Sequence, residues 1–162
     1  MIKLLHNNTT VAYNSFKKAA LSDGLTWQYQ DSDTGMPFYC HSLLGRPEGS
    51  YSMVADEKLT ELATHVVKEI LENNEIKYQF FLRSALNCVH PDNDVQLSEP
   101  HVDHDFPHIN VLIYLTNSGG KTYCGDEFHD PKEDDVILMT GEHWMERPEV
   151  GRRIILVNTL YT

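Results

Sequence analysis

The chain has 162 residues, of which 41% are hydrophobic and 23% are charged. These values are typical of a globular protein with a substantial core, so we expect one domain over residues 1–162. The formal net charge is -11, which argues against nucleic acids and anionic membranes as partners, because both favour clustered lysine and arginine. No apolar run approaches the roughly 20 residues of a membrane span.

The cysteines point to a reducing environment. There are three, at positions 40, 88 and 124, and they form no CxxC pair. An odd, dispersed set argues against a disulfide framework and against a thiolate zinc site. The N-terminus has only a very short apolar stretch, which makes a poor signal peptide. We therefore expect a cytoplasmic protein, and we expect it to be a monomer or a homodimer.

Two helices are predicted in the first part of the chain. Residues 9–22 have a helical apolar period that ends at Gly24, and residues 56–74 carry a broad apolar stripe with acidic residues in the first turn. Residues 31–55 contain Gly, Pro, Ser and Asp at short intervals and are predicted to be loops with room for one short strand. The apolar side of the first helix is expected to comprise Val11, Phe16, Ala20 and Leu21.

After residue 76 the apolar pattern changes to that of strands. Turn-like segments separate short apolar runs at spacings near ten residues, which favours an antiparallel sandwich or barrel. Crossover helices between these runs are absent from the pattern, which argues against a parallel α/β sheet. The expected fold class is mainly β (α+β), with helices first and a jelly roll after them. The predicted strands are 77–89, 109–115, 121–128, 135–139 and 153–161.

Three histidines and two aspartates stand directly before an apolar strand in the segment EPHVDHDFPHINVLIYL, residues 99–115. Residues i and i+2 of a strand point to the same face, so His101 and Asp103 would converge on one point. His143, between two predicted strands, is well placed as a third ligand. Two histidines and one carboxylate form the facial triad of non-haem Fe(II) oxygenases. The alternatives are a solvated polar turn and an acid–base pair.

The HxD spacing alone is a weak signal, since the chain has nine histidines. A second match, His90-Pro91-Asp92, contains a proline that disfavours a central strand. His104 is a possible competitor for the metal, whereas Asp105 and His108 are expected in a loop or at a rim.

A cationic residue follows the distal histidine. Arg153 lies ten residues after His143 and opens the apolar run IILV. An arginine that faces the same cavity as a metal is costly unless an anion meets it, and a dicarboxylate co-substrate would supply one. The alternative is that Arg152 and Arg153 are surface charges on an edge strand.

Several short motifs follow one another in the second half of the chain. They are His101-Val102-Asp103, Tyr114-Leu115-Thr116-Asn117, Gly119-Gly120-Lys121-Thr122, and His143 followed by Gly151 and Arg153. In this order and spacing, over about residues 80–162, they resemble the 2-oxoglutarate/Fe(II)-dependent dioxygenase superfamily, and most closely its prolyl-hydroxylase-like branch. The ending RIILVNTLY is similar to small phage-type or marine bacterial members. The resemblance implies a distorted double-stranded β-helix over about 76–162, with residues 1–75 as its helical support.

The resemblance also implies an activity and roles for single residues. His101, Asp103 and His143 would ligate Fe(II), while Arg153 and Tyr114 would bind the far carboxylate of 2-oxoglutarate. The implied enzyme uses O2 and hydroxylates a protein or peptide side chain, such as proline, or a small metabolite. It would convert 2-oxoglutarate to succinate and CO2, with ascorbate as a reductant.

Two points of the resemblance stay open. Both Arg152 and Arg153 stand at offsets that occur in the family; Arg153 is favoured because Gly151 precedes it by two residues. The tyrosine that often lies upstream of HxD has no counterpart, and His90 and Asn87 stand near its place as loop residues or as contacts of the co-substrate.

Two other functional classes compete with the oxygenase. A hydrolase or isomerase on a similar barrel would use the same triad around Zn²⁺ or Mn²⁺ to activate water and would need no arginine. A non-catalytic ligand-binding jelly roll would carry the histidines incidentally. In either case we expect residues 28–55 and the loop 104–108 to form the pocket entrance. Arg83 either reaches across the cavity toward substrate or pairs with an acidic residue.

Overall fold

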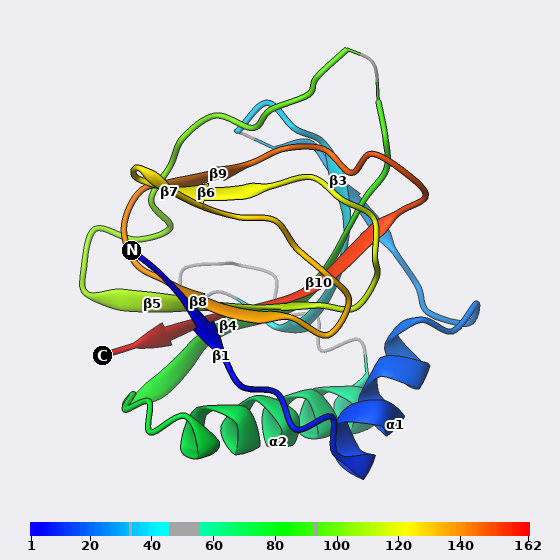
Figure 1. Ribbon diagram of the computed structural model, residues 1–162. Coiled ribbons are helices and arrows are strands. Elements are labelled where there is room, and N and C mark those ends of the chain that lie inside the picture. Colours follow the sequence, from blue (N-terminus) through cyan, green and yellow to red (C-terminus); the bar gives the residue numbers. More distant parts are fainter. Residues whose placement is uncertain (33, 46–55, 93) are drawn as a thin grey trace.

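The computed structural model describes residues 1–32, 34–45, 56–92 and 94–162 (Figure 1). In these residues it contains two helices, α1 (Val11–Ala20) and α2 (Glu57–Asn73), and ten strands. The strands are β1 (Ile2–Leu5), β2 (Gln28–Gln30), β3 (Phe38–Leu44), β4 (Phe80–Val89), β5 (His108–Tyr114), β6 (Thr122–Cys124), β7 (Glu127–His129), β8 (Val136–Met139), β9 (His143–Met145) and β10 (Arg153–Tyr161).

The strands form two antiparallel sheets that face each other. The larger sheet has the order β1-β8-β5-β10-β4-β3-β2, and the smaller sheet has the order β7-β6-β9. Figure 1 shows the smaller sheet on one side of the larger sheet and both helices on the other side. The prediction of a mainly β jelly roll with supporting helices is therefore confirmed.

Strand β10 shows how side-chain alternation divides the interior into two layers. Ile154, Leu156 and Leu160 belong to the core cluster between the larger sheet and the helices. Ile155 and Val157 belong to a second cluster, between the two sheets. Because successive side chains of a strand point to opposite faces, β10 serves both layers, which explains its nearly continuous apolar sequence. The space between the sheets is where the polar site lies.

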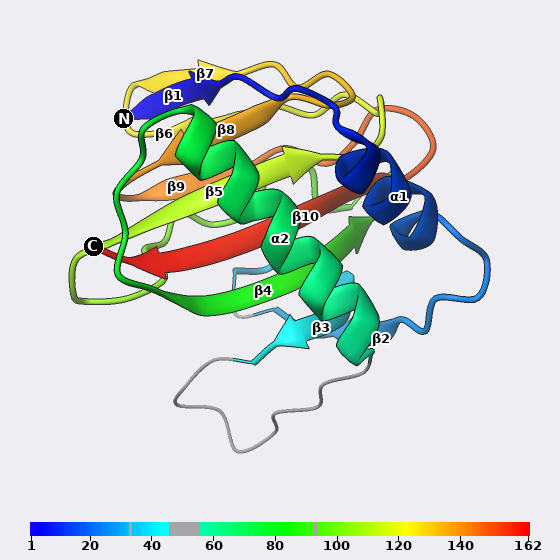
Figure 2. The same ribbon diagram turned by 90° about the horizontal axis from the view of Figure 1, so that it is seen from below.

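Both helices begin at a residue whose side chain accepts a backbone N–H. Thr10 accepts from Tyr13, and Asp56 accepts from Leu59, which satisfies N–H groups that have no partner within the helix. The apolar stripe of α1 differs from the prediction, since Val11 is 85% exposed. Figure 2 shows α2 crossing the strands of the larger sheet, with α1 beside it. The buried helical side chains are Tyr13, Phe16, Ala20, Leu59, Ala63, Val66, Val67, Ile70 and Leu71.

Some strands differ from the predicted ones. The expected strand 121–128 is a hairpin of β6 and β7, which turns at Gly125 with a φ of 58°. Strand β9 occupies a stretch that reads as a turn in the sequence, and residues 1–75 supply β1, β2 and β3 as well as the helices. Short strands of this kind depend on partners distant in sequence.

In the described part of the chain, no helix has the length and apolar character needed to cross a membrane.

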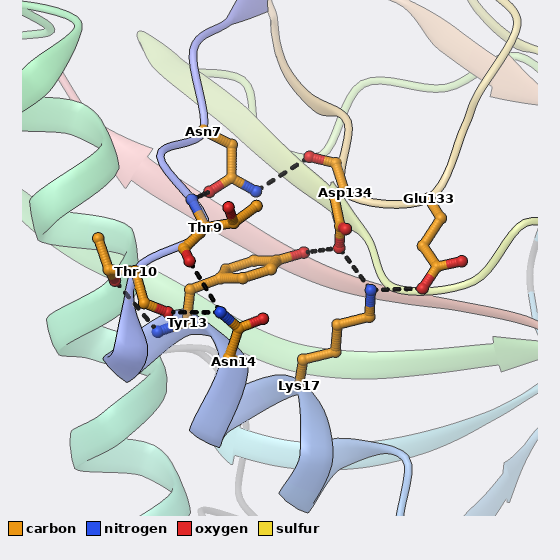
Figure 3. A network of polar contacts seen from close by, with 8 residues as sticks. All are labelled: Asn7, Thr9, Thr10, Tyr13, Asn14, Lys17, Glu133 and Asp134. Carbon is orange, nitrogen blue, oxygen red and sulfur yellow. Dashed lines mark hydrogen bonds and ion pairs between the residues drawn. The ribbon is translucent and has the colours of Figure 1, made fainter.

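A polar network ties α1 to the β7–β8 loop (Figure 3). The Tyr13 hydroxyl donates to Asp134 Oδ1 at 2.6 Å, and Lys17 Nζ lies 2.6 Å from the same oxygen. Lys17 also pairs with Glu133, and the Asn7 amide donates to the Asp134 carbonyl. Burial, followed by the Asp134 carboxylate, raises the pKa of Tyr13, so the phenol stays protonated as a donor.

Replacing Tyr13 with phenylalanine is expected to lower the free energy of unfolding by about 1–2 kcal/mol, because a hydrogen bond to a charged acceptor is lost. Urea unfolding followed by circular dichroism measures this change. Tyr29→Phe is the control, since Tyr29 is 59% exposed and should behave as the wild type does. Equal stabilities for the two variants would show that the network does not contribute to the fold.

Candidate functional site

Backbone pairing brings the predicted triad together. Residues 97–101 run antiparallel to β9, and His101 and His143 exchange backbone hydrogen bonds of 3.0 and 2.9 Å. Their rings lie 4.4 Å apart between centroids. Asp103 Oδ2 lies 3.5 Å from His143 Nε2. Each of the three side chains therefore contacts or approaches another, although they come from separate parts of the sequence.

Both histidine rings are oriented by the backbone. Nδ1 of His101 lies 3.0 Å from the Glu99 carbonyl, and Nδ1 of His143 lies 3.0 Å from the Gly141 carbonyl. A carbonyl accepts only, so each Nδ1 carries the proton and each Nε2 keeps its lone pair for a ligand. Burial lowers the pKa of His143, which favours the neutral ring that binds metal ions.

The carboxylate is held by a hydrogen-bonded chain across the larger sheet. The side-chain amide of Asn110 donates to Asp103 Oδ2 at 2.8 Å, and the Thr159 hydroxyl donates to Asn110 Oδ1 at 2.9 Å. Asn110 and Thr159 are both buried, and the Asp103 side chain is 8% exposed. Sequence reasoning missed this support. Its only sequence signal is the presence of polar residues inside two largely apolar strands, Asn110 in β5 and Asn158-Thr159 in β10.

The three side chains are of the types found in a facial triad, but they are not arranged as a complete metal site. Among the residues that the structure describes, no three His, Cys, Asp or Glu side chains are already placed to hold a metal ion. Two imidazoles and one carboxylate nevertheless suit Fe(II), and the orientation of both rings leaves the required nitrogens available. His104, the possible competitor, stacks on Phe106 with ring centroids 4.6 Å apart.

Arg153 is a buried cation with unused donors. It is 1% exposed, and its Nη1 donates to the Gly120 carbonyl at 3.0 Å. In the described part of the chain, its Nε and Nη2 have no hydrogen-bond partner. Burial lowers its pKa, and a buried guanidinium without an anion is costly. Arg152 is exposed, so only Arg153 of the two is placed to bind an anion in the interior.

Tyr114 adds a neutral polar group to the same interior layer. Its hydroxyl lies 2.7 Å from the Thr122 hydroxyl, and both residues are fully buried. Burial raises the pKa of Tyr114 to about 12, although the charge of Arg153 acts in the opposite direction. Tyr114 therefore stays protonated and able to donate. The sequence indicates a turn at Gly-Gly-Lys-Thr but gives no sign that Thr122 meets the Tyr114 hydroxyl.

The turn before Thr122 packs closely against the arginine. Gly120 has a φ of 83°, and a Cβ there would clash with the Arg147 carbonyl and lie 2.9 Å from Arg153 Nη1. Gly125 has a φ of 58°, but a Cβ there would meet nothing within 4 Å. The two glycines therefore share an unfavourable backbone region and differ in the space around them.

We expect Gly120→Ala to destabilise the protein by about 1–3 kcal/mol more than Gly125→Ala, because only the first adds overpacking to the cost of a positive φ. Denaturant unfolding of both variants measures the difference. Equal losses would mean that the turn moves away from Arg153 without cost.

A cavity of about 500 Å³ opens beside the triad. Of the expected entrance, residues 28–55, the cavity is lined by Gln30, Asp31, Ser32, Thr34, Met36 and Phe38; residues 33 and 46–55 lie outside the described residues. The loop 104–108 does not line it. Trp144 stacks on Tyr123 and is not part of this lining. His90 is exposed, and its ring lies edge-on to that of Tyr39. The lining consists of Gln30, Asp31, Ser32, Thr34, Met36, Phe38, Arg83, Asn87, Val89, Ser98, His101, Asp103, Met145 and Ile155.

Oxygenases are among the solved structures with a similar fold. No family model matches the sequence, and no curated protein matches it significantly. An oxidoreductase of the 2OG-Fe(II) oxygenase family from Burkholderia pseudomallei matches with a TM-score of 0.72 and 13% identity, over 99% of this chain and 85% of that chain.

Two prolyl hydroxylases are also similar. The enzyme from Trichoplax adhaerens, solved with a peptide fragment of hypoxia inducible factor, gives a TM-score of 0.62 at 11% identity, over 99% of this chain and 83% of that chain. A prolyl-4-hydroxylase from Pseudomonas putida gives 0.58 at 10% identity, over 99% of this chain and 92% of that chain. At such identities the likeness concerns the fold: the chain has the double-stranded β-helix fold of the 2OG-Fe(II) oxygenases.

Proposed function

We propose that the protein is a 2-oxoglutarate- and Fe(II)-dependent dioxygenase. The observation that carries the proposal is the buried Arg153, whose Nε and Nη2 have no partner in the described residues. A hydrolytic metal site has no need of such a cation, whereas a dicarboxylate co-substrate supplies the missing anion. The fold and the nearby pair of imidazoles with a carboxylate agree with this reading.

In the proposed site, Nε2 of His101, Nε2 of His143 and the Asp103 carboxylate hold Fe(II). The bound metal supplies the redox chemistry by which O2, 2-oxoglutarate and a C–H group give succinate, CO2 and a hydroxyl group. Asn110 keeps the Asp103 carboxylate in place through its 2.8 Å hydrogen bond. The backbone carbonyls at Nδ1 keep both rings in the tautomer that binds a metal.

Arg153 and Tyr114 bind the far carboxylate of 2-oxoglutarate. Two donors of the guanidinium have no partner among the described residues, and a planar fork suits a carboxylate. The protonated phenol of Tyr114 provides a further donor, with Thr122 at its hydroxyl. The apolar side chains of the same layer, such as Ile155 and Val157, exclude water from the carboxylate, which strengthens the charged contact.

The substrate of the proposed enzyme is a protein or peptide side chain, such as proline, or a small metabolite, and ascorbate serves as the reductant. The structure of the Trichoplax adhaerens prolyl hydroxylase holds a peptide, which supports the first choice by analogy only. We propose a monomer or homodimer related to the small phage-type or marine bacterial members of the superfamily.

The proposal is tested by incubating the protein with 2-oxoglutarate, O2 and Fe(II) and measuring succinate. We expect succinate with Fe(II) and none with Zn²⁺ alone or without O2. A hydrolytic activity that runs on Zn²⁺ after iron removal would instead identify a metal-dependent hydrolase. The absence of any metal-dependent shift in melting temperature would identify a non-catalytic ligand-binding jelly roll.

A further inference from the structure

The larger sheet ends at a short strand that borders the candidate site. In the described part of the chain β2 pairs only with β3, so its second edge has no partner strand, and Figure 2 shows it at the margin of the sheet. Gln30 of β2, with Asp31 and Ser32 after it, lines the cavity beside the triad. An unpaired strand edge offers backbone N–H and C=O groups to an extended polypeptide. A chain bound at this edge would therefore reach the cavity.

Side-chain alternation gives such a polypeptide two different environments. Gln30 and its register partner Phe38 both line the cavity. Tyr29 and its partner Tyr39 therefore point to the other side of the sheet. These tyrosines are 59% and 40% exposed, and their rings meet edge-on with centroids 5.7 Å apart. A strand added to β2 would direct every second side chain toward the cavity and place those between them beside the tyrosines.

The segments around this edge contain acidic residues but no lysine or arginine. Residues 19–45 and 84–120 supply most of the cavity lining and have neither basic residue. Arg83 is the cation of the described lining, but it is half-buried and its guanidinium interacts with the Cys40 thiol on β3. The two segments are therefore negatively charged, which attracts a cationic partner. Their exposed carboxylates are Asp23, Asp31, Asp92, Asp94, Glu99 and Asp105.

Two of these carboxylates lie close to the cavity. Asp31 is part of its lining, and the backbone N–H of Glu99 donates at 2.8 Å to the carbonyl of Thr34, which also lines the cavity. The exposed tyrosines on the other face add a second preference for cations, because the negative face of an aromatic ring attracts an ammonium or guanidinium group. Lysine and arginine side chains suit both features.

The cavity offers a hydrogen-bond acceptor to the bound chain. Asn87 lines it, and its Oδ1 is buried without a hydrogen-bond partner in the described part of the chain. Such an acceptor gains from an N–H donor, which every peptide unit except that of proline supplies. Arg83 interacts with Cys40, the register partner of Asn87, so its charge lies at the level of this acceptor and disfavours a second cation there. The residue that enters the cavity is therefore not itself basic, whereas its neighbours are.

We propose that β2 docks a basic segment of a partner protein as an added strand. This strand delivers one side chain to the triad between lysine or arginine neighbours, which lie beside Tyr29 and Tyr39. The inference rests on the proposed oxygenase function, of which it names the substrate class. Hydroxylation is then expected on a residue within a polypeptide chain and not on a free metabolite.

The test uses protein loaded with Mn(II) and 2-oxoglutarate, together with labelled decapeptides whose ends are blocked. In the basic pool, lysine alternates with a mixture of uncharged residues, and in two matched pools glutamine or glutamate replaces lysine. Fluorescence anisotropy should show the basic pool binding at least roughly tenfold more tightly than the glutamine pool, with an affinity that falls as salt rises. The glutamate pool should bind most weakly. With Fe(II), the basic pool alone should raise succinate formation.

A pool of the same composition, with its lysines clustered at one end, tests the alternation. It carries the same charge, so general electrostatic attraction acts equally on both pools. A strand on β2 places alternating lysines, and not clustered ones, beside the tyrosines. We expect the clustered pool to bind at least roughly threefold more weakly. Equal binding of the two would contradict docking at β2.

Variants test the same surface from the side of the protein. Tyr29→Ala should weaken the basic pool roughly three- to tenfold, and Tyr29→Phe should not, because phenylalanine keeps the aromatic face. Phe128→Ala, at an exposed aromatic residue of β7 in the other sheet, is the control and should bind as the wild type does. Asp31→Asn should lower the affinity and its salt dependence more than Asp126→Asn, which makes the same change of charge at an exposed position between β6 and β7.

The outcomes separate the two proposals. Protein that neither binds 2-oxoglutarate nor forms succinate contradicts the oxygenase function and this inference with it. Protein that does both, yet binds the basic and glutamine pools equally or binds neither, contradicts the inference alone. Succinate formation raised by free amino acids, and by none of the pools, would assign the cavity to a small metabolite and contradict the inference as well. The peptide comparisons need only the wild-type protein, so they hold even where Tyr29→Ala fails to fold.

Discussion

Asp103→Ala is expected to abolish both metal binding and succinate formation. The substitution removes the only carboxylate of the proposed triad and leaves two neutral imidazoles, which bind a divalent cation far more weakly than a charged set does. It also leaves the Asn110 amide without its acceptor at 2.8 Å. Calorimetry with Mn(II), together with succinate formation under Fe(II), measures the two losses separately.

Asp105→Ala is the matched control for this substitution. Asp105 lies two residues further along the same segment, carries the same charge and is exposed. The control separates loss of a ligand from loss of a local negative charge, which weakens cation binding less and in a salt-dependent way. Equal metal affinities for the Asp103 and Asp105 variants would remove the carboxylate from the proposed centre, and with it the facial triad.

The proximity of His101, Asp103 and His143 could be predicted in part, because two of the three residues are close in sequence. His101 and Asp103 have the i, i+2 spacing of one strand face, and they stand beside β5, whose apolar run is clear in the sequence. The position of His143 is harder to predict, because β9 has only three residues and its sequence has the pattern of a turn. Its position depends on backbone pairing with His101, and short sequences carry little information about such non-local pairing.

The polar groups that support the site could not be predicted from the sequence either, because their contacts also depend on non-local strand pairing. Thr159 and Asn110 face each other because β10 and β5 pair in one register. A shift of either strand by one residue would turn its own polar side chain to the other face of the sheet and break the contact. Nothing in either strand fixes that register alone. The preference for Arg153 over Arg152, in contrast, needed only a local spacing, because Gly151 precedes Arg153 by two residues. In the structure Arg153 is buried and Arg152 is exposed.

Arg153→Gln is expected to weaken binding of 2-oxoglutarate by about 1.5–3 kcal/mol, or roughly 10- to 150-fold, because a charge-assisted pair with a carboxylate is replaced by neutral hydrogen bonds. Glutamine keeps an amide donor but is shorter and neutral, so the loss reports the charge together with the planar fork. Calorimetry with 2-oxoglutarate in the presence of Mn(II) measures the change in dissociation constant. The affinity for Mn(II) alone should stay close to that of the wild type.

Arg152→Gln makes the neighbouring change directly before β10, in an exposed position. It removes the same charge from the protein, so both variants experience the same change in overall electrostatic attraction for a dianion, and only the buried contact distinguishes them. The salt dependence adds a second criterion, since screening acts on exposed charges and much less on the buried Arg153. A loss of affinity equal in the two variants would therefore show that the co-substrate does not reach the Nε and Nη2 donors of Arg153, and the proposed function would lose the observation on which it rests.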